Sequence, residues 1–141
     1  MTRREKIFVG LYGTYEVLLN VGSGSFMLLA PVAFLQQYAP LASTAEISTD
    51  LAQMLVRSFG MMVVTLGLAQ LPAIRLGSQT VRRWLIVALL LGDIVHFAVS
   101  WPYFAAYGVW NFGSIFNFGN TIGLALSRTY FLLAGIPQKR R

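Results

Sequence analysis

The chain of 141 residues contains no cysteine and little charge, with only 11% of its residues acidic or basic. The absence of cysteine excludes disulfide bonds, thiolate nucleophiles and metal sites built from thiolates. A hydrophobic content of 56% and a mean hydropathy of +0.63 are too high for a soluble domain of this length. We therefore expect a single-domain membrane protein.

Acidic residues are especially scarce, five against eleven basic residues, which gives a formal net charge of +6. A nucleic-acid-binding protein gathers its basic residues along one face to contact phosphates. Here most of them flank apolar runs, at residues 3–6, 75–83 and 139–141, so we expect no nucleic-acid partner. Because cytosolic loops of membrane proteins are enriched in Lys and Arg, both termini are predicted to be cytosolic, with the endoplasmic reticulum as the expected membrane. Trp84 would then lie at the cytosolic interface, and the opposite interface would hold Trp101, Tyr103, Tyr107 and Trp110.

Four long apolar runs predict four transmembrane helices, since about 20 apolar residues are needed to cross the hydrocarbon core. They cover about residues 7–29, 51–71, 84–103 and 116–136, and they end at or near Pro31, Pro72, Pro102 and Pro137. The polar stretch 36–50 is expected to be a loop, with a helix N-cap at Ser48 or Thr49. The expected fold class is an all-α membrane protein, a four-transmembrane-helix bundle of residues 1–141 with a polar cavity at mid-membrane depth.

Glycines are frequent within the expected spans, and small residues let helix backbones approach closely in lipid. Gly119 and Gly123 form a GxxxG pattern in the last span, which predicts close packing of that helix against a neighbour. A compact bundle would account for most of the other glycines.

Ionisable residues inside the apolar runs are the strongest candidates for a functional site. Glu16, Asp93 and Arg128 each lie ten or eleven residues from the basic flank of their own span. At about 1.5 Å per residue this places all three about 15 Å deep, near the middle of a core about 30 Å thick. Because an isolated charge at that depth is costly, we expect the three side chains to meet inside the bundle.

Polar neighbours follow the same helical faces. Asn20 lies one turn after Glu16, and His96, the only histidine, lies three residues after Asp93. A polar arc on the last span contains Asn117, Asn120, Thr121 and Arg128. This pattern predicts the polar cavity, although each group also has a purely structural interpretation: a packing salt bridge for Glu16 and Arg128, contact with interfacial water for His96, and interhelical hydrogen bonds for the asparagines.

Two carboxylates beside one arginine should not ionise alike in a medium of low dielectric constant. The one paired with Arg128 is expected to stay ionised and the other to hold a proton, which supplies a base and an acid. We assign the base to Asp93, oriented by His96 and Arg128, and the acid to Glu16, and the reverse assignment stays open. A metal ion held by Glu16, Asp93 and His96 would lack the ligand spacing of a dedicated site, so no metal or other cofactor is expected.

Several of these residues also carry a resemblance to a known family. The matching positions are Tyr15 and Glu16 and, further along, Leu91–His96, Trp110–Asn111, Asn117–Asn120 and Ser127–Arg128. They resemble a fungal family of small four-span membrane proteins catalogued as a domain of unknown function, in which tryptophan often stands where this chain has Phe118. That family is similar to the small hydrolases encoded beside reducing polyketide synthases in fungal clusters for aurovertin- and citreoviridin-type polyenes.

The resemblance implies an enzyme of fungal secondary metabolism that opens the epoxide of a lipophilic polyene dissolved in the bilayer. Glu16 would protonate the epoxide oxygen while Asp93 takes a proton from water or an internal hydroxyl, and Arg128 would keep Asp93 charged. Water or substrate would be positioned by Asn20, Asn117, Asn120 and Trp110. A homo-oligomer is compatible with this interpretation.

Two other classes of function remain open. A terpene cyclase or sterol-type isomerase would use the same acid, with a carbocation stabilised by an aromatic cluster of Phe112, Phe116, Phe118, Tyr130 and Phe131. A lipid-binding or scaffold protein would use the polar centre for packing only. A channel fits less well, because four short spans enclose a narrow pore.

Overall fold

The computed structural model describes residues 1–38 and 40–137, apart from the side chains of Tyr38, Tyr103 and Tyr107, and the basic segment 139–141 lies outside these residues. All regular structure in the described part of the chain is helical. Two helices are long and apolar enough to cross a membrane, α5 (Asp50–Leu76) and α6 (Gln79–Tyr107). The expected all-helical fold is therefore confirmed, together with apolar helices of membrane-spanning length.

The N-terminal part of the chain supplies a third candidate span. It consists of α1 (Arg3–Gly10), a π-helical turn η1 (Leu11–Tyr15), α2 (Glu16–Leu29) and, after a bend of 114°, α3 (Pro31–Tyr38). These segments are apolar enough for a span only when they are taken together as one bent unit. The last long helix is α7 (Phe112–Ala134). α7 does not reach the same apolar standard, because it carries the polar side chains predicted to form one face of a site.

The described residues of the stretch 36–50 include helical segments where the sequence predicted a loop. Proline at the first position of a helix costs nothing, since that N–H has no intrahelical partner, and Pro31 begins α3 rather than only ending α2. A short helix α4 (Thr44–Ile47) follows, capped by Ser43. The predicted N-cap of α5 is confirmed as Thr49, whose side chain accepts a hydrogen bond from the Ala52 N–H.

Two prolines do not end their helices as predicted. α5 continues past Pro72 to Leu76, and α6 continues past Pro102 to Tyr107. Each proline lies close to the end of its helix, where it removes a hydrogen bond without disrupting a long ladder on its C-terminal side. α7 begins four residues earlier than the expected 116, because Asn111 and Ser114 form a reciprocal capping box.

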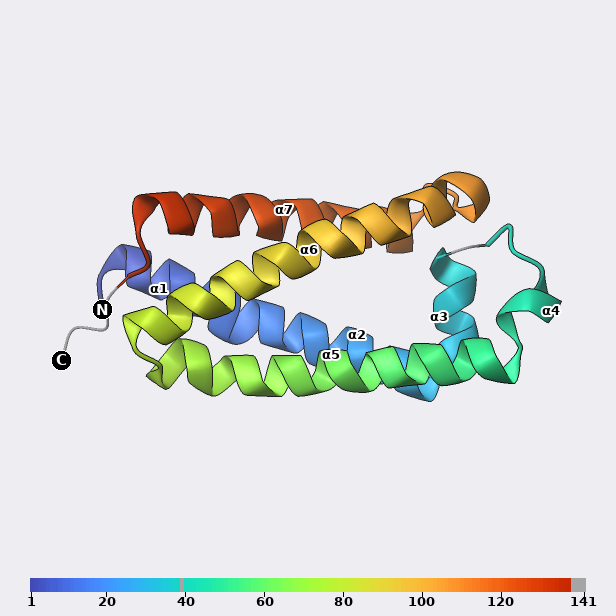
Figure 1. The fold of residues 1–141 in the computed structure, drawn as a ribbon, viewed down its shortest axis with the longest axis horizontal. Coiled ribbons are helices and arrows are strands. Elements are labelled where there is room, and N and C mark those ends of the chain that lie inside the picture. The colour runs from blue at the N-terminus through green and yellow to red at the C-terminus, as the bar shows by residue number, and fades with distance from the viewer. Residues whose placement is uncertain (39, 138–141) are drawn as a thin grey trace.

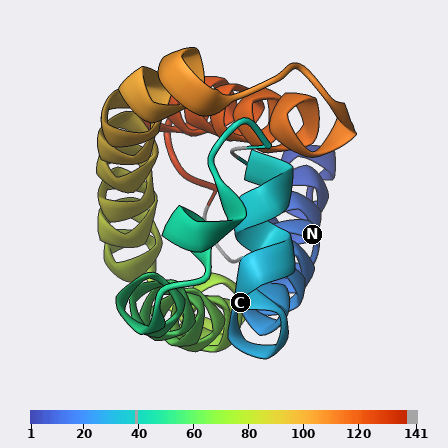
Figure 2. The same ribbon diagram turned by 90° about the vertical axis from the view of Figure 1, so that its right-hand side faces the viewer.

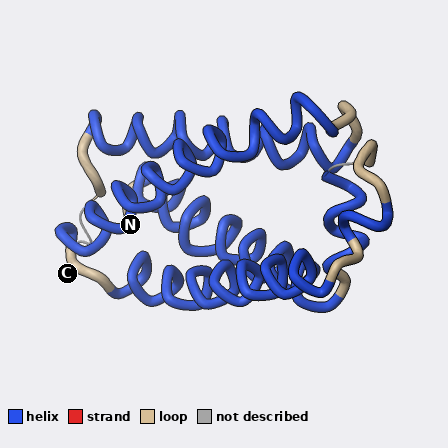
Figure 3. The backbone as a smooth tube through the Cα atoms, turned by 45° about the vertical axis from the view of Figure 1, so that its right-hand side comes forward, coloured by secondary structure: helices blue, strands red, loops and turns tan. Residues whose placement is uncertain are grey.

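The long helices lie side by side along the molecule (Figure 1). One end, which we call the basic end, contains residues 1–10, 72–86 and 130–137, and both described chain termini lie there. The other end, which we call the loop end, contains α3, α4 and the connection 108–111. Viewed from the loop end, α2, α5, α6 and α7 are arranged around a ring (Figure 2), and the backbone tube in Figure 3 shows the same order.

Close helix packing occurs at different glycines from those predicted. A Cβ atom at Gly24 would lie 2.6 Å from the carbonyl oxygen of Gly60, so α2 and α5 approach each other at a position where both residues must be small. By contrast, a Cβ atom at Gly119 or Gly123 would meet nothing within 4 Å. The GxxxG pattern of α7 therefore does not pack against another helix of this chain, and that prediction was wrong.

Candidate functional site

The predicted meeting of three charged side chains is confirmed. Arg128 on α7 forms ion pairs with Glu16 at the start of α2 and with Asp93 on α6. The Glu16 and Arg128 side chains are each 2% exposed, whereas that of Asp93 is 16% exposed. The Arg128 guanidinium also donates to the Leu89 carbonyl oxygen at 3.4 Å. We call Glu16, Asp93 and Arg128 the central site.

The π-helical turn η1 leads directly into the central site. The backbone N–H of Glu16 donates to the carbonyl of Leu11, which is the wide hydrogen-bond spacing of a π turn. Tyr12, within this turn, is fully buried, and its hydroxyl lies 2.7 Å from Ser127 Oγ. Turns of this kind are frequent at functional sites because they change the direction of side chains on an otherwise regular helix.

Gln70 on α5 is a buried residue of this region that the sequence analysis missed. Its Nε2 donates to the Tyr12 carbonyl oxygen at 2.7 Å, and its Oε1 accepts from Asn20 Nδ2 at 3.3 Å. Asn20, predicted to position water or substrate, is thus connected to the backbone of the π turn through Gln70. The available signal was a long polar side chain next to the end of an apolar run, a place where such residues usually reach water.

His96 lies one turn beyond Asp93 on α6, toward the loop end. Its Nε2 is 3.4 Å from Asn117 Nδ2 on α7, and its Nδ1 is 3.5 Å from Ser100 Oγ. The structure therefore brings His96 and Asn117 together, two of the predicted site residues from different helices. The predicted role of His96 in orienting Asp93 stays a prediction.

Asn120 lies on α7 and contacts η1, whereas Asn117 contacts α6. Its Oδ1 accepts a hydrogen bond of 2.5 Å from the Tyr15 hydroxyl, and both residues line a small cavity of about 170 Å³ between η1 and α7. Gly119 and Gly123 line the same cavity. The polar arc of α7 is therefore divided among three neighbours: Asn117 faces α6, Asn120 faces η1, and Arg128 reaches both α2 and α6.

Trp110 belongs to an aromatic cluster at the loop end. The cluster consists of Phe97, Trp101, Phe104, Trp110 and Phe118, and the rings of Trp110 and Phe104 lie 4.8 Å apart. Phe118 precedes Arg128 by ten residues on α7, so the cluster lies about 15 Å from the central arginine along the helix axis. Trp110 does not adjoin the central site.

The aromatic cluster predicted for a cyclase is not formed. Phe118 packs in the loop-end cluster, whereas Phe131 packs with Phe8 and Tyr12 near the basic end. Phe112 is 84% exposed and Tyr130 57% exposed. The five residues therefore do not surround a common space, because their positions on α7 point in several directions.

A second buried charged site lies at the basic end and was not predicted. Glu5 and Arg82 form an ion pair of 3.9 Å with side chains 3% and 2% exposed. Arg82 also donates to the Pro137 carbonyl oxygen at 3.2 Å, and its guanidinium lies 5.8 Å from the Phe8 ring centroid. Arg4 donates to the Gly135 carbonyl oxygen at 2.6 Å. We call Glu5 and Arg82 the end pair, because they lie at the basic end. The pair links α1 to α6, and Arg82 links both to the segment after α7.

The groups at and beside the central site are two carboxylates, one guanidinium, side-chain amides, one imidazole and the hydroxyls of Tyr12 and Ser127. No group of three or more His, Asp or Glu side chains in these residues is placed to hold a metal ion. The central site has two acidic residues and one basic residue, whereas the end pair has one acidic and one basic residue. The central site is therefore the one with an uncompensated negative charge when every group is ionised.

Comparisons with known proteins place the chain in a family. No curated protein and no solved structure matches it. A family model described as a domain of unknown function, DUF7704, matches residues 6–137, a range that includes all three residues of the central site. Because this match covers most of the chain, the protein belongs to the DUF7704 family.

Proposed function

We propose that this protein is a membrane-embedded enzyme that opens an epoxide on a lipophilic polyene by acid–base catalysis, in fungal secondary metabolism. The observation that carries the proposal is the contact of a single buried arginine, Arg128, with two carboxylates from different helices. An ionised pair alone would suffice for packing. The additional carboxylate leaves room for one exchangeable proton, which is what an acid–base catalyst requires.

The proposed arrangement in the membrane has four crossings. The N-terminal rod α1–α2, then α5, α6 and α7 each cross once, and both termini are cytosolic. This arrangement is supported by the hydrogen bond from Arg4 to Gly135, which holds the start and the end of the described chain at the same end of the molecule. α7 could cross despite its polar residues because Asn117, Asn120 and Arg128 bond to other helices.

In the proposed reaction, the protonated carboxyl of Glu16 donates its proton to the epoxide oxygen as the carbon–oxygen bond breaks. Asp93 takes a proton from water, or from an internal hydroxyl, whose oxygen forms the new bond to carbon. Asp93 is the more exposed of the two acids, so it is the one that water reaches first. The proton lost by Glu16 equals the one gained by Asp93, and its return between the two carboxyls completes the cycle.

The surroundings suit a long apolar substrate. The loop-end aromatic cluster would hold the hydrocarbon part, with His96 and Asn117 between it and Asp93. Asn20, Asn120 and Trp110 keep their proposed positioning roles toward water or the polyene. The similarity described above between the resembled fungal family and the hydrolases of aurovertin- and citreoviridin-type clusters implies the same substrate class.

The test is turnover of a lipophilic polyene epoxide by membranes that contain the wild type, Asp93→Asn or Glu16→Gln. Removal of a general acid or base is expected to lower the rate by about 10²- to 10⁴-fold. Glu5→Gln is the matched control, because it neutralises another buried carboxylate paired with an arginine. The amount of folded protein is measured for each variant by detergent extraction and size-exclusion chromatography.

Three results would contradict the proposal. If wild-type membranes open no polyene epoxide, the proposed substrate class is excluded. If Asp93→Asn turns over the epoxide as fast as wild type, the acid–base role of Asp93 is excluded. Equal losses in Glu5→Gln and Asp93→Asn, with folded protein present, would indicate a general effect of buried charge. Reaction in water labelled with oxygen-18 identifies the attacking oxygen, because attack by water incorporates the label, whereas attack by an internal hydroxyl and isomerisation do not.

A further inference from the structure

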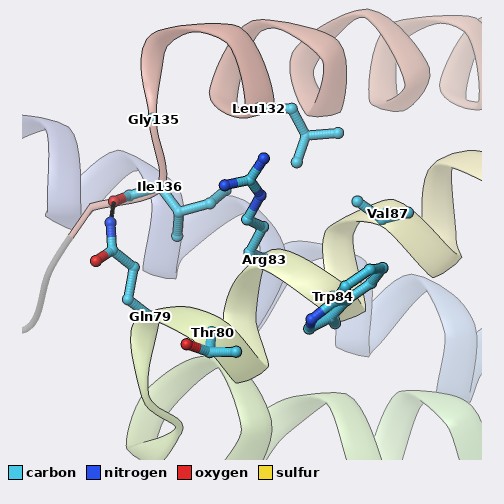
Figure 4. A pocket seen from close by; sticks show the side chains of 8 residues that line it. All are labelled: Gln79, Thr80, Arg83, Trp84, Val87, Leu132, Gly135 and Ile136. Carbon is cyan, nitrogen blue, oxygen red and sulfur yellow. Dashed lines mark hydrogen bonds between the residues drawn. The ribbon is translucent and has the colours of Figure 1, made fainter.

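We propose that a cavity at the basic end, between the first turns of α6 and the C-terminal end of α7, binds an anionic phospholipid. The cavity has a volume of about 460 Å³ and is shown in Figure 4. Its lining includes Gln79, Thr80, Arg83, Trp84, Val87 and Leu132. No residue of the central site or of the end pair lines it, so the inference is independent of the proposed catalytic function.

Arg83 supplies the positive charge of this cavity, and Figure 4 shows its side chain extending from α6 toward the end of α7. The preceding residue, Arg82, is buried and paired with Glu5. Arg83, by contrast, is exposed, and within the part of the chain that the structure describes it has neither a hydrogen bond nor an ion pair. A guanidinium presents parallel N–H donors that match the oxygens of a phosphate.

The lining changes from polar to apolar in the direction that a phospholipid requires. Gln79 and Thr80 lie in the first turn of α6, at the outer edge of the molecule, whereas Val87 lies about 6 Å further along the helix than Arg83. Leu132 faces the cavity from α7. A headgroup at Arg83 would therefore continue into an acyl chain beside Val87 and Leu132, and Trp84, 68% exposed, has the amphipathic ring typical of the membrane interface.

The charge of the basic end favours an anionic headgroup over a zwitterionic one. Its described residues include six basic side chains, Arg3, Arg4, Lys6, Arg75, Arg82 and Arg83, and the only acidic one, Glu5, is paired with Arg82. Basic pockets between transmembrane helices are a known setting for anionic headgroups. A free phosphate would use Arg83 but would leave the apolar part of the cavity empty, so the lipid is the occupant that the whole lining fits.

The experiment is native mass spectrometry of the full-length protein in detergent, titrated with phosphatidylglycerol or phosphatidylcholine. Wild type is expected to bind phosphatidylglycerol more tightly, and Arg83→Gln to lose about fivefold in affinity for it. Lys6→Gln is the matched control, since it removes one exposed charge from the same end outside the cavity. Val87→Gln tests the acyl part and should weaken binding of the lipid without altering the charge.

Competition with soluble phosphate compounds tests whether the site recognises a phospholipid or phosphate alone. Inorganic phosphate and glycerol phosphate, added at the same concentrations, are expected not to displace the lipid. Displacement by either would mean that the site binds phosphate alone and would overturn the lipid assignment. Equal affinity of wild type and Arg83→Gln, or equal losses in Arg83→Gln and Lys6→Gln, would show diffuse attraction to a basic surface and would also overturn it.

Discussion

The central site and the end pair use the same chemical groups in different proportions. At the basic end, one carboxylate and one guanidinium form a balanced pair. The guanidinium of Arg82 also donates a hydrogen bond to the Pro137 carbonyl oxygen. At the centre, one guanidinium serves two carboxylates, Glu16 and Asp93. Both arginines are almost fully buried, so burial alone does not separate them.

The difference gives the proposed function a physical criterion by which a reactive charge would differ from a structural one. A balanced buried pair is electrically complete, and its arrangement joins chain segments. An unbalanced group carries a net charge that its surroundings of low dielectric constant oppose, so it readily binds a proton. Only Asp93 differs in exposure, at 16%, because Glu16 and Arg128 are each 2% exposed and both members of the end pair are at most 3% exposed.

The largest effect is expected from removing the two arginines one at a time. Arg128→Leu leaves two carboxylates facing each other, whereas Arg82→Leu leaves only Glu5, and breaking a buried pair costs about 3–5 kcal/mol. We expect Arg128→Leu to reach the upper part of that range or to fail to fold, and Arg82→Leu the lower part. Unfolding free energies in mixed detergent micelles measure both. Greater destabilisation by Arg82→Leu would break the distinction between the sites.

A smaller effect is expected when a pair is removed as a unit. Replacing a whole buried ion pair with apolar residues is often close to neutral, so Glu5→Leu with Arg82→Met should stay within about 1 kcal/mol of wild type. Turnover of the epoxide should also persist in this double variant. Glu16→Leu with Arg128→Met should abolish turnover whatever its stability. Loss of turnover in the first double variant would mean that the end pair is not merely structural.

The smallest effect is expected at an exposed carboxylate, Glu46, which serves as a reference for the buried ones. Hydrogen bonds from the Ser43 side chain and backbone N–H lower the pKa of Glu46. A lowered pKa stabilises the folded cap above the unfolded pKa, and this contribution is lost as the pH falls through the folded pKa. The hydrogen-exchange protection factors of the α4 amides, corrected for the intrinsic pH dependence of exchange, should therefore fall in acid in wild type and depend less on pH in Glu46→Gln, with turnover unchanged. An equal pH dependence in both proteins would contradict this.

The central site could be predicted from the sequence because depth in a membrane is proportional to residue number along a helix. Counting from the basic flanks placed Glu16, Asp93 and Arg128 at one level, and the cost of isolated charge required them to meet. The same reasoning did not predict the burial of Glu5. It lies within a basic flank, and such flanks were interpreted as markers of membrane orientation rather than as sources of buried contacts.

Helix ends and side-chain directions were harder to predict. Proline was taken as a stop, yet α5 and α6 continue beyond Pro72 and Pro102, because a proline near a helix end breaks few hydrogen bonds. The GxxxG of α7 predicted a packed face, but which glycines lie at a contact depends on helix rotation. Gly24 and Gly60 make that contact, and rotation is not readable from spacing alone.

The link between Glu16 and Arg128 also sets an order of events during synthesis. The two residues are separated by 112 positions in the chain, so the acid leaves the ribosome long before its partner. At about 5–20 residues per second, the delay is roughly 6 to 22 seconds. During that interval the first helix carries a carboxyl group without its cation. The nascent protein must therefore keep this group neutral or close to water until the last helix arrives, which makes the docking of α7 the step that completes the central site.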